Sequence, residues 1–142
     1  MSGNVLGRVF FDSNVLIYTD DSTSPEKQRK ARELVDHHLR RNSGFLSVQV
    51  LQEYFVNATR KHGVDAAVAR EKIEILGTMH VVTPDTRDVL AAIDLHRLHR
   101  FSFWDSMIFR AVQESGCGVL LSEDLQHGRI IDGIEIVNPF LD

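Results

Sequence analysis

The chain has 142 residues, of which 43% are hydrophobic, so it is long enough and apolar enough to form one globular domain with a buried core. No apolar run is long enough to cross a membrane, the single cysteine, Cys117, excludes an internal disulfide, and residues 1–7 lack the pattern of a secretory signal. These features predict a cytoplasmic protein, and the net charge of −4 argues against a general nucleic-acid binder.

The first predicted element is a short strand, Val9–Phe11, whose uninterrupted apolar residues are typical of a strand buried on both faces. The strand stops at Asp12, and Ser13 and Asn14 suit a sharp turn into the next apolar run, Val15–Tyr18. In open α/β sheets the carboxyl ends of the strands are where ligands bind, which makes Asp12 a candidate site residue. The alternative is that Asp12 only caps the turn.

The next elements are a helix over Pro25–Arg41, a very short strand, Phe45–Leu46, and a helix that Ser47 caps and that ends near Lys61. The last of these helices is nearly apolar, and it carries Glu53 among its hydrophobic residues. A carboxylate in such surroundings needs water or a partner, so Glu53 either faces solvent or belongs to a site.

A further helix is predicted over Asp65–Thr78, followed by a strand, His80–Val82, and by a helix that begins after Asp85 and ends near His99. His96 and His99 have a spacing at which a helix could hold a metal ion. Because no further ligands accompany them, we interpret both as surface histidines.

The most apolar helix of the chain ends at Ser115–Gly116. Near its start, Ser102 and Asp105 match a capping box, which gives Asp105 a structural alternative to a role in a site. Phe103 and Trp104 are expected to close the core rather than to stack on a base.

The remaining elements are a strand, Gly118–Leu121, an acidic turn, Ser122–Asp124, a loop, Leu125–Gly128, a turn, Ile130–Gly133, and a last short strand, Ile134–Val137. This alternation of strands and helices predicts a single α/β domain over residues 1–142. Its sheet is expected to be mainly parallel, with four to five short strands and helices on both faces.

Four acids stand at strand ends or near helix starts: Asp12, Glu53, Asp105 and Asp124. In a parallel sheet these positions share one edge, so we expect the four carboxylates to converge there. Grouped carboxylates raise each other's pKa unless a cation is present, and oxygen ligands favour Mg²⁺ or Mn²⁺ over zinc. Such a site supports displacement at phosphorus. If four of the 20 acids bind metal, the other 16 balance the 16 Lys and Arg residues.

Four segments together resemble the acidic motifs of PIN domains, and in particular those of the VapC-like toxins of prokaryotic toxin–antitoxin pairs. They are Phe11–Tyr18, the internal Glu53, Ser102–Ile108 and Leu120–Leu125. The resemblance implies a three-layer α/β/α sandwich and an endoribonuclease that depends on Mg²⁺ or Mn²⁺. It also implies an RNA substrate, frequent homodimers and inhibition by a cognate antitoxin.

The resemblance also implies roles for individual residues. Asp12, Glu53, Asp105 and Asp124 would be the catalytic metal ligands, and Asn14 and Ser122 would support them by hydrogen bonds. Glu123 could compete with Asp124 for its role. Two basic pairs, Arg60 with Lys61 and Arg97 with Arg100, are candidates for binding RNA, although each could equally be a solvated helix face.

Three alternatives remain. A phosphohydrolase of the haloacid dehalogenase type also begins with a strand that ends in Asp, but it needs a second acid where this chain has Asn14. A response-regulator receiver expects an acidic pair near the first strand, and Asp20 and Asp21 lie too far from Asp12. A non-catalytic relative that only binds RNA or a partner would be expected to lack one or more of the four acids.

Overall fold

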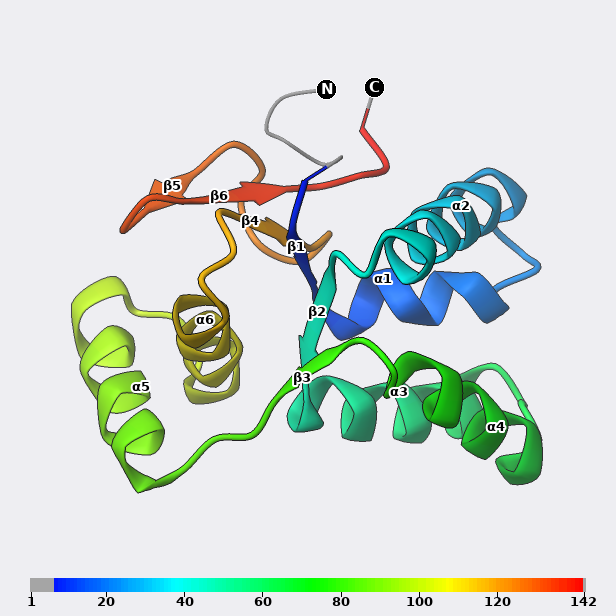
Figure 1. Cartoon of the computed structure of the whole chain (residues 1–142), viewed down its shortest axis with the longest axis horizontal. Helices are drawn as coiled ribbons and strands as arrows, with labels where there is room; N and C mark the ends of the chain where they lie inside the picture. The colour runs from blue at the N-terminus through cyan, green and yellow to red at the C-terminus, as the bar shows by residue number, and fades with distance from the viewer. Residues whose placement is uncertain (1–6, 142) are drawn as a thin grey trace.

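The computed structural model describes residues 7–141. Residues 1–6, in which we expected no secretory signal, and Asp142 lie outside the described range. The described chain forms a sheet between two groups of helices (Figure 1). Helices α5 and α6 lie on one side of the sheet, and α1, α2, α3 and α4 lie on the other. The predicted α/β/α sandwich is therefore confirmed.

The sheet has six described strands in the order β3-β2-β1-β4-β6-β5. All neighbouring pairs are parallel except β5 with β6, which is antiparallel. The strands are β1 (Val9–Phe11), β2 (Gly44–Ser47), β3 (His80–Val82), β4 (Val119–Leu121), β5 (Ile130–Ile131) and β6 (Ile134–Val137). The mainly parallel sheet is as predicted, but β5 occupies a segment for which the sequence predicted only a turn.

Six α-helices and one short 3₁₀ helix, η1, connect these strands in the described chain. The helices are α1 (Ser13–Ile17), η1 (Tyr18–Asp20), α2 (Pro25–Arg41), α3 (Val48–Lys61), α4 (Ala66–Leu76), α5 (Thr86–His99) and α6 (Phe103–Ser115). Their caps explain several boundaries, since Ser47 caps α3 and Asp65 caps α4 by side-chain hydrogen bonds. None of the described helices has the length and apolar character that a membrane span requires.

The two central strands, β1 and β4, are buried along their whole length, as expected for strands covered by helices on both faces. Phe11 pairs with Leu121, so the two strands end side by side. Asp12 follows the first strand and Ser122 follows the second. Strand β2, on the other side of β1, ends at Ser47 and leads directly into α3. Residues at three adjacent strand ends can therefore meet at one edge.

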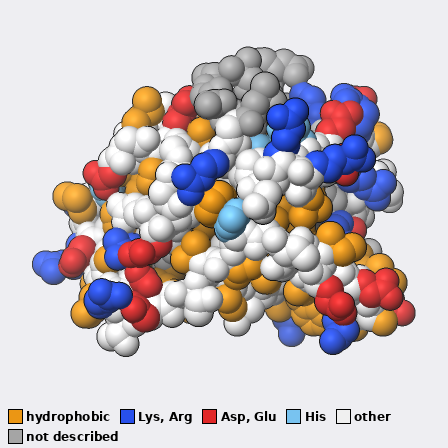
Figure 2. Space-filling model, in the orientation of Figure 1, with side chains coloured by type: hydrophobic (Ala, Val, Ile, Leu, Met, Phe, Trp, Pro, Cys, Tyr) orange, Lys and Arg blue, Asp and Glu red, His pale blue; other side chains and the backbone are white. Residues whose placement is uncertain are grey.

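On the face shown in Figure 2, acidic and basic side chains are interspersed toward the periphery, with hydrophobic side chains between them. A surface of this kind does not produce a strong field of a single sign. That face therefore offers no argument for binding nucleic acid.

Candidate functional site

Asp12 is buried at the carboxyl end of β1, where its side chain caps the short helix α1. Its Oδ1 accepts a hydrogen bond of 2.8 Å from the backbone amide of Ser13. Its Oδ2 accepts one of 2.9 Å from the hydroxyl of Ser122, at the end of β4. Asp12 is therefore a cap, as the structural alternative proposed, but it is also a buried carboxylate at the edge where ligands bind.

Asn14 and Ser122, which we predicted to support the site, link the turn after β1 to the loop after β4. The Asn14 amide nitrogen lies 3.3 Å from Asp12 Oδ2 and 3.3 Å from Ser122 Oγ. The side-chain oxygen of Asn14 accepts a 3.0 Å hydrogen bond from the backbone amide of Glu123. These bonds hold two loops that are more than 100 residues apart in the sequence in a fixed relation to each other.

Glu53, in α3, is half-buried and points toward the same site. Its Oε1 accepts a 2.9 Å hydrogen bond from the hydroxyl of Ser13, and its Oε2 accepts one of 3.1 Å from Gln49. The contact with Ser13 joins α3 to the residue that directly follows Asp12. The sequence predicted only a turn role for Ser13 and no role for Gln49, because no periodicity or motif shows which polar residues of neighbouring elements will meet.

Asp105 lies in the first turn of α6, where its backbone amide donates a 3.1 Å hydrogen bond to the hydroxyl of Ser102. Ser102 is thus the N-cap, as predicted. The reciprocal bond of a capping box, from the Ser102 amide to the Asp105 carboxylate, is not formed within residues 7–141. The carboxylate of Asp105 therefore does not cap the start of α6.

The pKa of Asp12 is affected by burial and by the charges of two of the other predicted acids. Burial raises the pKa of the Asp12 carboxyl from 3.8 to about 7, while hydrogen bonds from Ser122 and Ser13 act in the opposite direction. The negative charges of Glu53 and Asp105 also raise the pKa of Asp12. This is the response expected when like charges are brought together around a buried acid.

Asp124 and Glu123 occupy different positions in the loop after β4. The Glu123 carboxylate accepts hydrogen bonds from the Tyr18 hydroxyl at 2.6 Å and from Lys27 Nζ at 2.7 Å. Asp124 is exposed, and only its backbone amide contacts Ser122. Glu123 is therefore held by α2 and η1, whereas the Asp124 carboxylate makes no such contact within the described chain.

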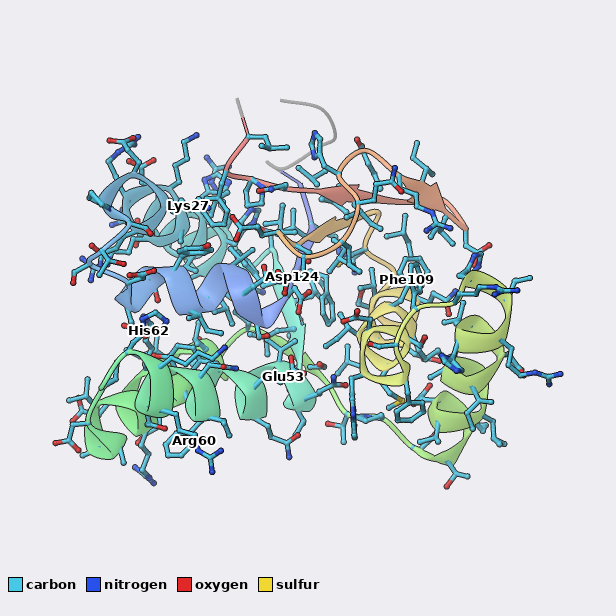
Figure 3. The ribbon with its side chains drawn as sticks, turned by 180° about the vertical axis from the view of Figure 1, so that it is seen from behind. Lys27, Glu53, Arg60, His62, Phe109 and Asp124 are labelled. Atoms are coloured by element: carbon cyan, nitrogen blue, oxygen red, sulfur yellow. The ribbon has the colours of Figure 1, made fainter. Side chains whose placement is uncertain are left out.

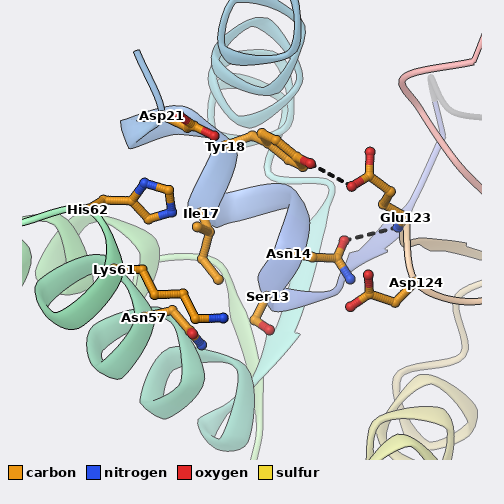
Figure 4. Close-up of a pocket in the computed structure, with 10 residues that line it drawn as sticks. All are labelled: Ser13, Asn14, Ile17, Tyr18, Asp21, Asn57, Lys61, His62, Glu123 and Asp124. Atoms are coloured by element: carbon orange, nitrogen blue, oxygen red, sulfur yellow. Dashed lines mark hydrogen bonds between the residues drawn. The ribbon is translucent and has the colours of Figure 1, made fainter. Parts of the chain in front are cut away.

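A pocket of about 280 Å³ lies beside these groups (Figure 4). Ser13, Asn14, Glu123 and Asp124 line one side of it, and Lys61 lies on the other, at the end of α3. The pocket therefore combines carboxylate and amide oxygens with a single lysine. A phosphate group held between a cation at the acids and the ammonium of Lys61 would suit this distribution of charge.

The charges of Glu53 and Asp105 act on Asp12, and Asp124 lines the pocket beside Asn14, but the four acids do not form a finished metal site. Within residues 7–141, no three Asp, Glu, His or Cys side chains are close enough to hold a metal ion as they stand. The chemistry of the donors nonetheless fits Mg²⁺ or Mn²⁺, because all four are carboxylates and Asp12 carries the electrostatic strain that a cation would relieve.

The predicted basic residues fall in different places. Arg60 lies on the outer side of α3, away from Glu53 and Asp124 (Figure 3). Arg97 and Arg100 are exposed at the end of α5, and neither forms an ion pair with another described residue.

The two predicted surface histidines contact the segment between α5 and α6. The Nδ1 atom of His96 lies 2.5 Å from the carbonyl oxygen of Phe101, and the His99 ring stacks on the Phe101 ring. Neither histidine belongs to a group of three or more possible metal ligands within the described chain.

The sequence matches the model of the PIN domain family over residues 9–132. Among solved structures, the chain is similar to VapC20 of Mycobacterium tuberculosis, which is described as a toxin that cleaves the sarcin-ricin loop. The two share 21% sequence identity and a TM-score of 0.58, and the match covers 79% of this chain and 86% of VapC20. At that identity the similarity concerns the fold. No curated protein matches the sequence.

Proposed function

This chain belongs to the PIN domain family, and we propose that it is a metal-dependent endoribonuclease that acts as the toxin of a toxin–antitoxin pair. The observation that carries the proposal is the environment of Asp12. Its carboxylate is buried at the carboxyl edge of the sheet, and the charges of Glu53 and Asp105 act on it. A concentration of negative charge of this kind is costly for a fold, and a divalent cation would offset the cost.

Asp12, Glu53, Asp105 and Asp124 would hold Mg²⁺ or Mn²⁺. A divalent cation in such a site supplies Lewis-acid chemistry, which lowers the pKa of water and stabilises the oxygen that leaves phosphorus. The remaining residues position the acids and the substrate. Ser122 holds Asp12, Ser13 holds Glu53, and Lys61 lines the pocket where a phosphate would lie.

Hydrolysis by activated water should leave a 5′-phosphate and a 3′-hydroxyl. The described site has no pair of histidines that would use the 2′-hydroxyl as the nucleophile. With a net charge of −4, the chain has little general attraction for phosphates. Its choice of RNA substrate must therefore depend on the shape of the RNA and on unstacked bases. The substrate we propose is an unpaired segment within a structured RNA, of the kind that the description of VapC20 names.

The proposed partners are a cognate antitoxin and a second copy of the chain, in the cytoplasm where their RNA would be. Helices α3, α4 and α5 expose large hydrophobic side chains, among them Val56, Val68, Ile75, Leu90 and Leu98. An apolar groove of about 350 Å³ lies on α3 and α4. Exposed apolar surface of this extent supports contact with other proteins. An antitoxin could inhibit by placing an Arg or Lys against the carboxylates.

The test is incubation of the purified chain with structured RNA in Mg²⁺, in Mn²⁺ and in EDTA, beside the Asp12→Asn variant. We expect cleavage only with metal and only by the wild-type chain, with 5′-phosphate ends that can be ligated directly. Undiminished cleavage in EDTA would refute the mechanism, as would 2′,3′-cyclic phosphate ends.

A second candidate is a non-catalytic PIN domain that binds RNA or a partner. The observation in its favour is that the described acids are not gathered tightly enough to hold a metal as they stand. A rise in melting temperature with Mg²⁺ or Mn²⁺ would favour the nuclease, and its absence would favour the non-catalytic candidate. A haloacid-dehalogenase-like reaction has less support, because Asn14 lies where a second acid would be needed, and its side chain is used to connect two loops.

A further inference from the structure

Trp104 is 62% exposed, although its sequence context predicted that it would close the core. It is the second residue of α6, and the ring of Phe103 packs edge-on against it, with 5.1 Å between the ring centroids. The prediction for Trp104 was therefore wrong, because the apolar face of α6 is supplied by residues further along the helix, such as Ile108 and Phe109. A large aromatic side chain that stays exposed to solvent is typical of a surface that binds a ligand or partner.

The backbone at Trp104 is tied to the candidate active site. Gln49 donates one hydrogen bond of 3.1 Å to the Trp104 carbonyl oxygen and another of 3.1 Å to Glu53 Oε2. The next residue in the chain is Asp105, whose charge acts on Asp12. The indole is therefore attached to a fixed backbone between two of the proposed metal ligands.

Two exposed arginines precede Trp104 in the sequence. Arg97 and Arg100 are exposed at the end of α5, which leads into α6 after three residues, and neither forms an ion pair with another described residue. An exposed aromatic ring and exposed arginines within seven residues of it in the sequence are suited to single-stranded nucleic acid, because the ring can stack on a base while the cations attract the backbone. A purely apolar protein interface would not require these charges.

We propose that Trp104 stacks on an unpaired base next to the phosphodiester held by the acids, and so selects single-stranded over paired RNA. The inference rests on the proposed function, since it assigns the site's specificity to this side chain. A base within a duplex is covered by its neighbours and cannot offer its face to the indole. Loss of one stacked base should weaken binding roughly 5- to 150-fold.

Trp104 is the only tryptophan of the chain, so its fluorescence reports on this one position. The wild-type chain in EDTA, where cleavage is not expected, would be titrated with a short single-stranded RNA and with the same sequence as a blunt duplex. We expect the single strand to quench the emission and the duplex to quench it much less. Binding by the variants would be followed by anisotropy of a labelled RNA.

The informative variants are Trp104→Ala, which removes the ring, and Trp104→Phe, which keeps a smaller one. The matched control is Ile130→Ala, which removes another exposed apolar side chain, on the edge strand β5. We expect Trp104→Ala to bind single-stranded RNA roughly 5- to 150-fold more weakly than wild type. We expect Trp104→Phe to retain most of the affinity and Ile130→Ala to behave as wild type. Because Trp104 is exposed, its variants should keep the wild-type melting temperature.

Either of two results from the binding and emission experiments would overturn the inference. One is single-stranded RNA binding by Trp104→Ala within twofold of wild type. The other is emission that changes with protein concentration but not with RNA, which would place the indole between copies of the chain. Quenching by single-stranded RNA, without any cleavage in Mg²⁺ or Mn²⁺, would support base stacking on Trp104 while refuting the proposed nuclease activity. Cleavage by Trp104→Ala with unaltered preference for unpaired RNA would refute the inference and leave the nuclease standing.

Discussion

The hydroxyl of Ser122 donates a hydrogen bond of 2.9 Å to Oδ2 of Asp12. This bond connects the ends of two adjacent central strands, which are aligned so that Phe11 pairs with Leu121. One part of the candidate site is therefore built on the sheet. The other part, Glu53 and Asp105, stands on helices on opposite sides of that sheet.

The division of the site between strand ends and helices explains why the acids do not form a finished metal site. The carboxylate of Asp12 is fixed by its buried hydrogen bonds, whereas the carboxylate of Asp105 makes none within the described chain. Without a cation, like charges favour such a spread arrangement. The behaviour of the site with and without metal can therefore be tested by stability as well as by activity.

The first prediction is that Asp12→Asn stabilises the metal-free protein above neutral pH. The pKa of Asp12 is raised from 3.8 to about 7 in the folded chain. An acid raised in this way favours the fold at pH values below its unfolded pKa, and that contribution is lost as the pH rises through the folded pKa. The Asn variant stays neutral, so it should match wild type near pH 4 and exceed it by roughly 1–4 kcal/mol at about pH 8.

The measurement is urea unfolding of both proteins in EDTA across this pH range. Asp124→Asn is the control, since Asp124 is exposed and its neutralisation should change the unfolding free energy little. If the difference between Asp12→Asn and wild type does not vary with pH, Asp12 is not the strained acid described above.

The second prediction is that Mg²⁺ or Mn²⁺ raises the melting temperature of the wild-type chain, because a ligand that binds only the folded state stabilises it. The effect should be larger at about pH 8 than at about pH 5.5, since Asp12 must lose its proton to bind a cation. Asp12→Asn should lose most of the effect. Absence of any shift at concentrations on the order of millimolar would favour the non-catalytic candidate.

The third prediction separates Glu123 from Asp124. Glu123 bonds to Tyr18 and Lys27, so Glu123→Gln should cost up to about 1 kcal/mol of stability while keeping the metal-induced shift. Asp124→Asn should keep the stability and reduce the shift. Melting curves with and without Mn²⁺ give both quantities for each variant. The reverse pattern would assign the ligand role to Glu123.

The strand ends show what the sequence could predict. The apolar run Val9–Phe11 stops abruptly at Asp12, and Gly118–Leu121 stops at Ser122, so both turns and their shared edge followed from the pattern alone. The caps Ser47 and Ser102 followed in the same way. These features are local, and the physical chemistry of a few adjacent residues decides them.

Other features depend on contacts that are distant in the sequence. The network in which Tyr54 donates a 2.5 Å hydrogen bond to Asp20, and Lys72 contacts both Asp20 and Thr19, joins three elements and has no local signature. The exposure of Trp104 depends on which face of α6 meets the sheet. All of its first four residues are aromatic or polar, at positions where the periodicity does not yet identify a face.

The final prediction concerns two adjacent basic residues. Lys61 lines the pocket beside the acids, whereas Arg60 lies on the outer side of α3 (Figures 3 and 4). If RNA lies along the pocket, Lys61 contacts a phosphate and Arg60 does not. Lys61→Ala should therefore weaken binding of single-stranded RNA and reduce the slope of log affinity against log salt by about 0.7, the value for one phosphate contact.

Arg60→Ala removes the same unit of charge one residue away, so it controls for the change in net charge. Its affinity and its salt slope should remain close to those of wild type, because a solvated cation outside the contact releases no counterion when RNA binds. Both quantities come from anisotropy titrations in EDTA at several salt concentrations. Equal losses in the two variants would mean that the chain attracts RNA only through its overall charge, and that the pocket beside Asp124 is not where the phosphate lies.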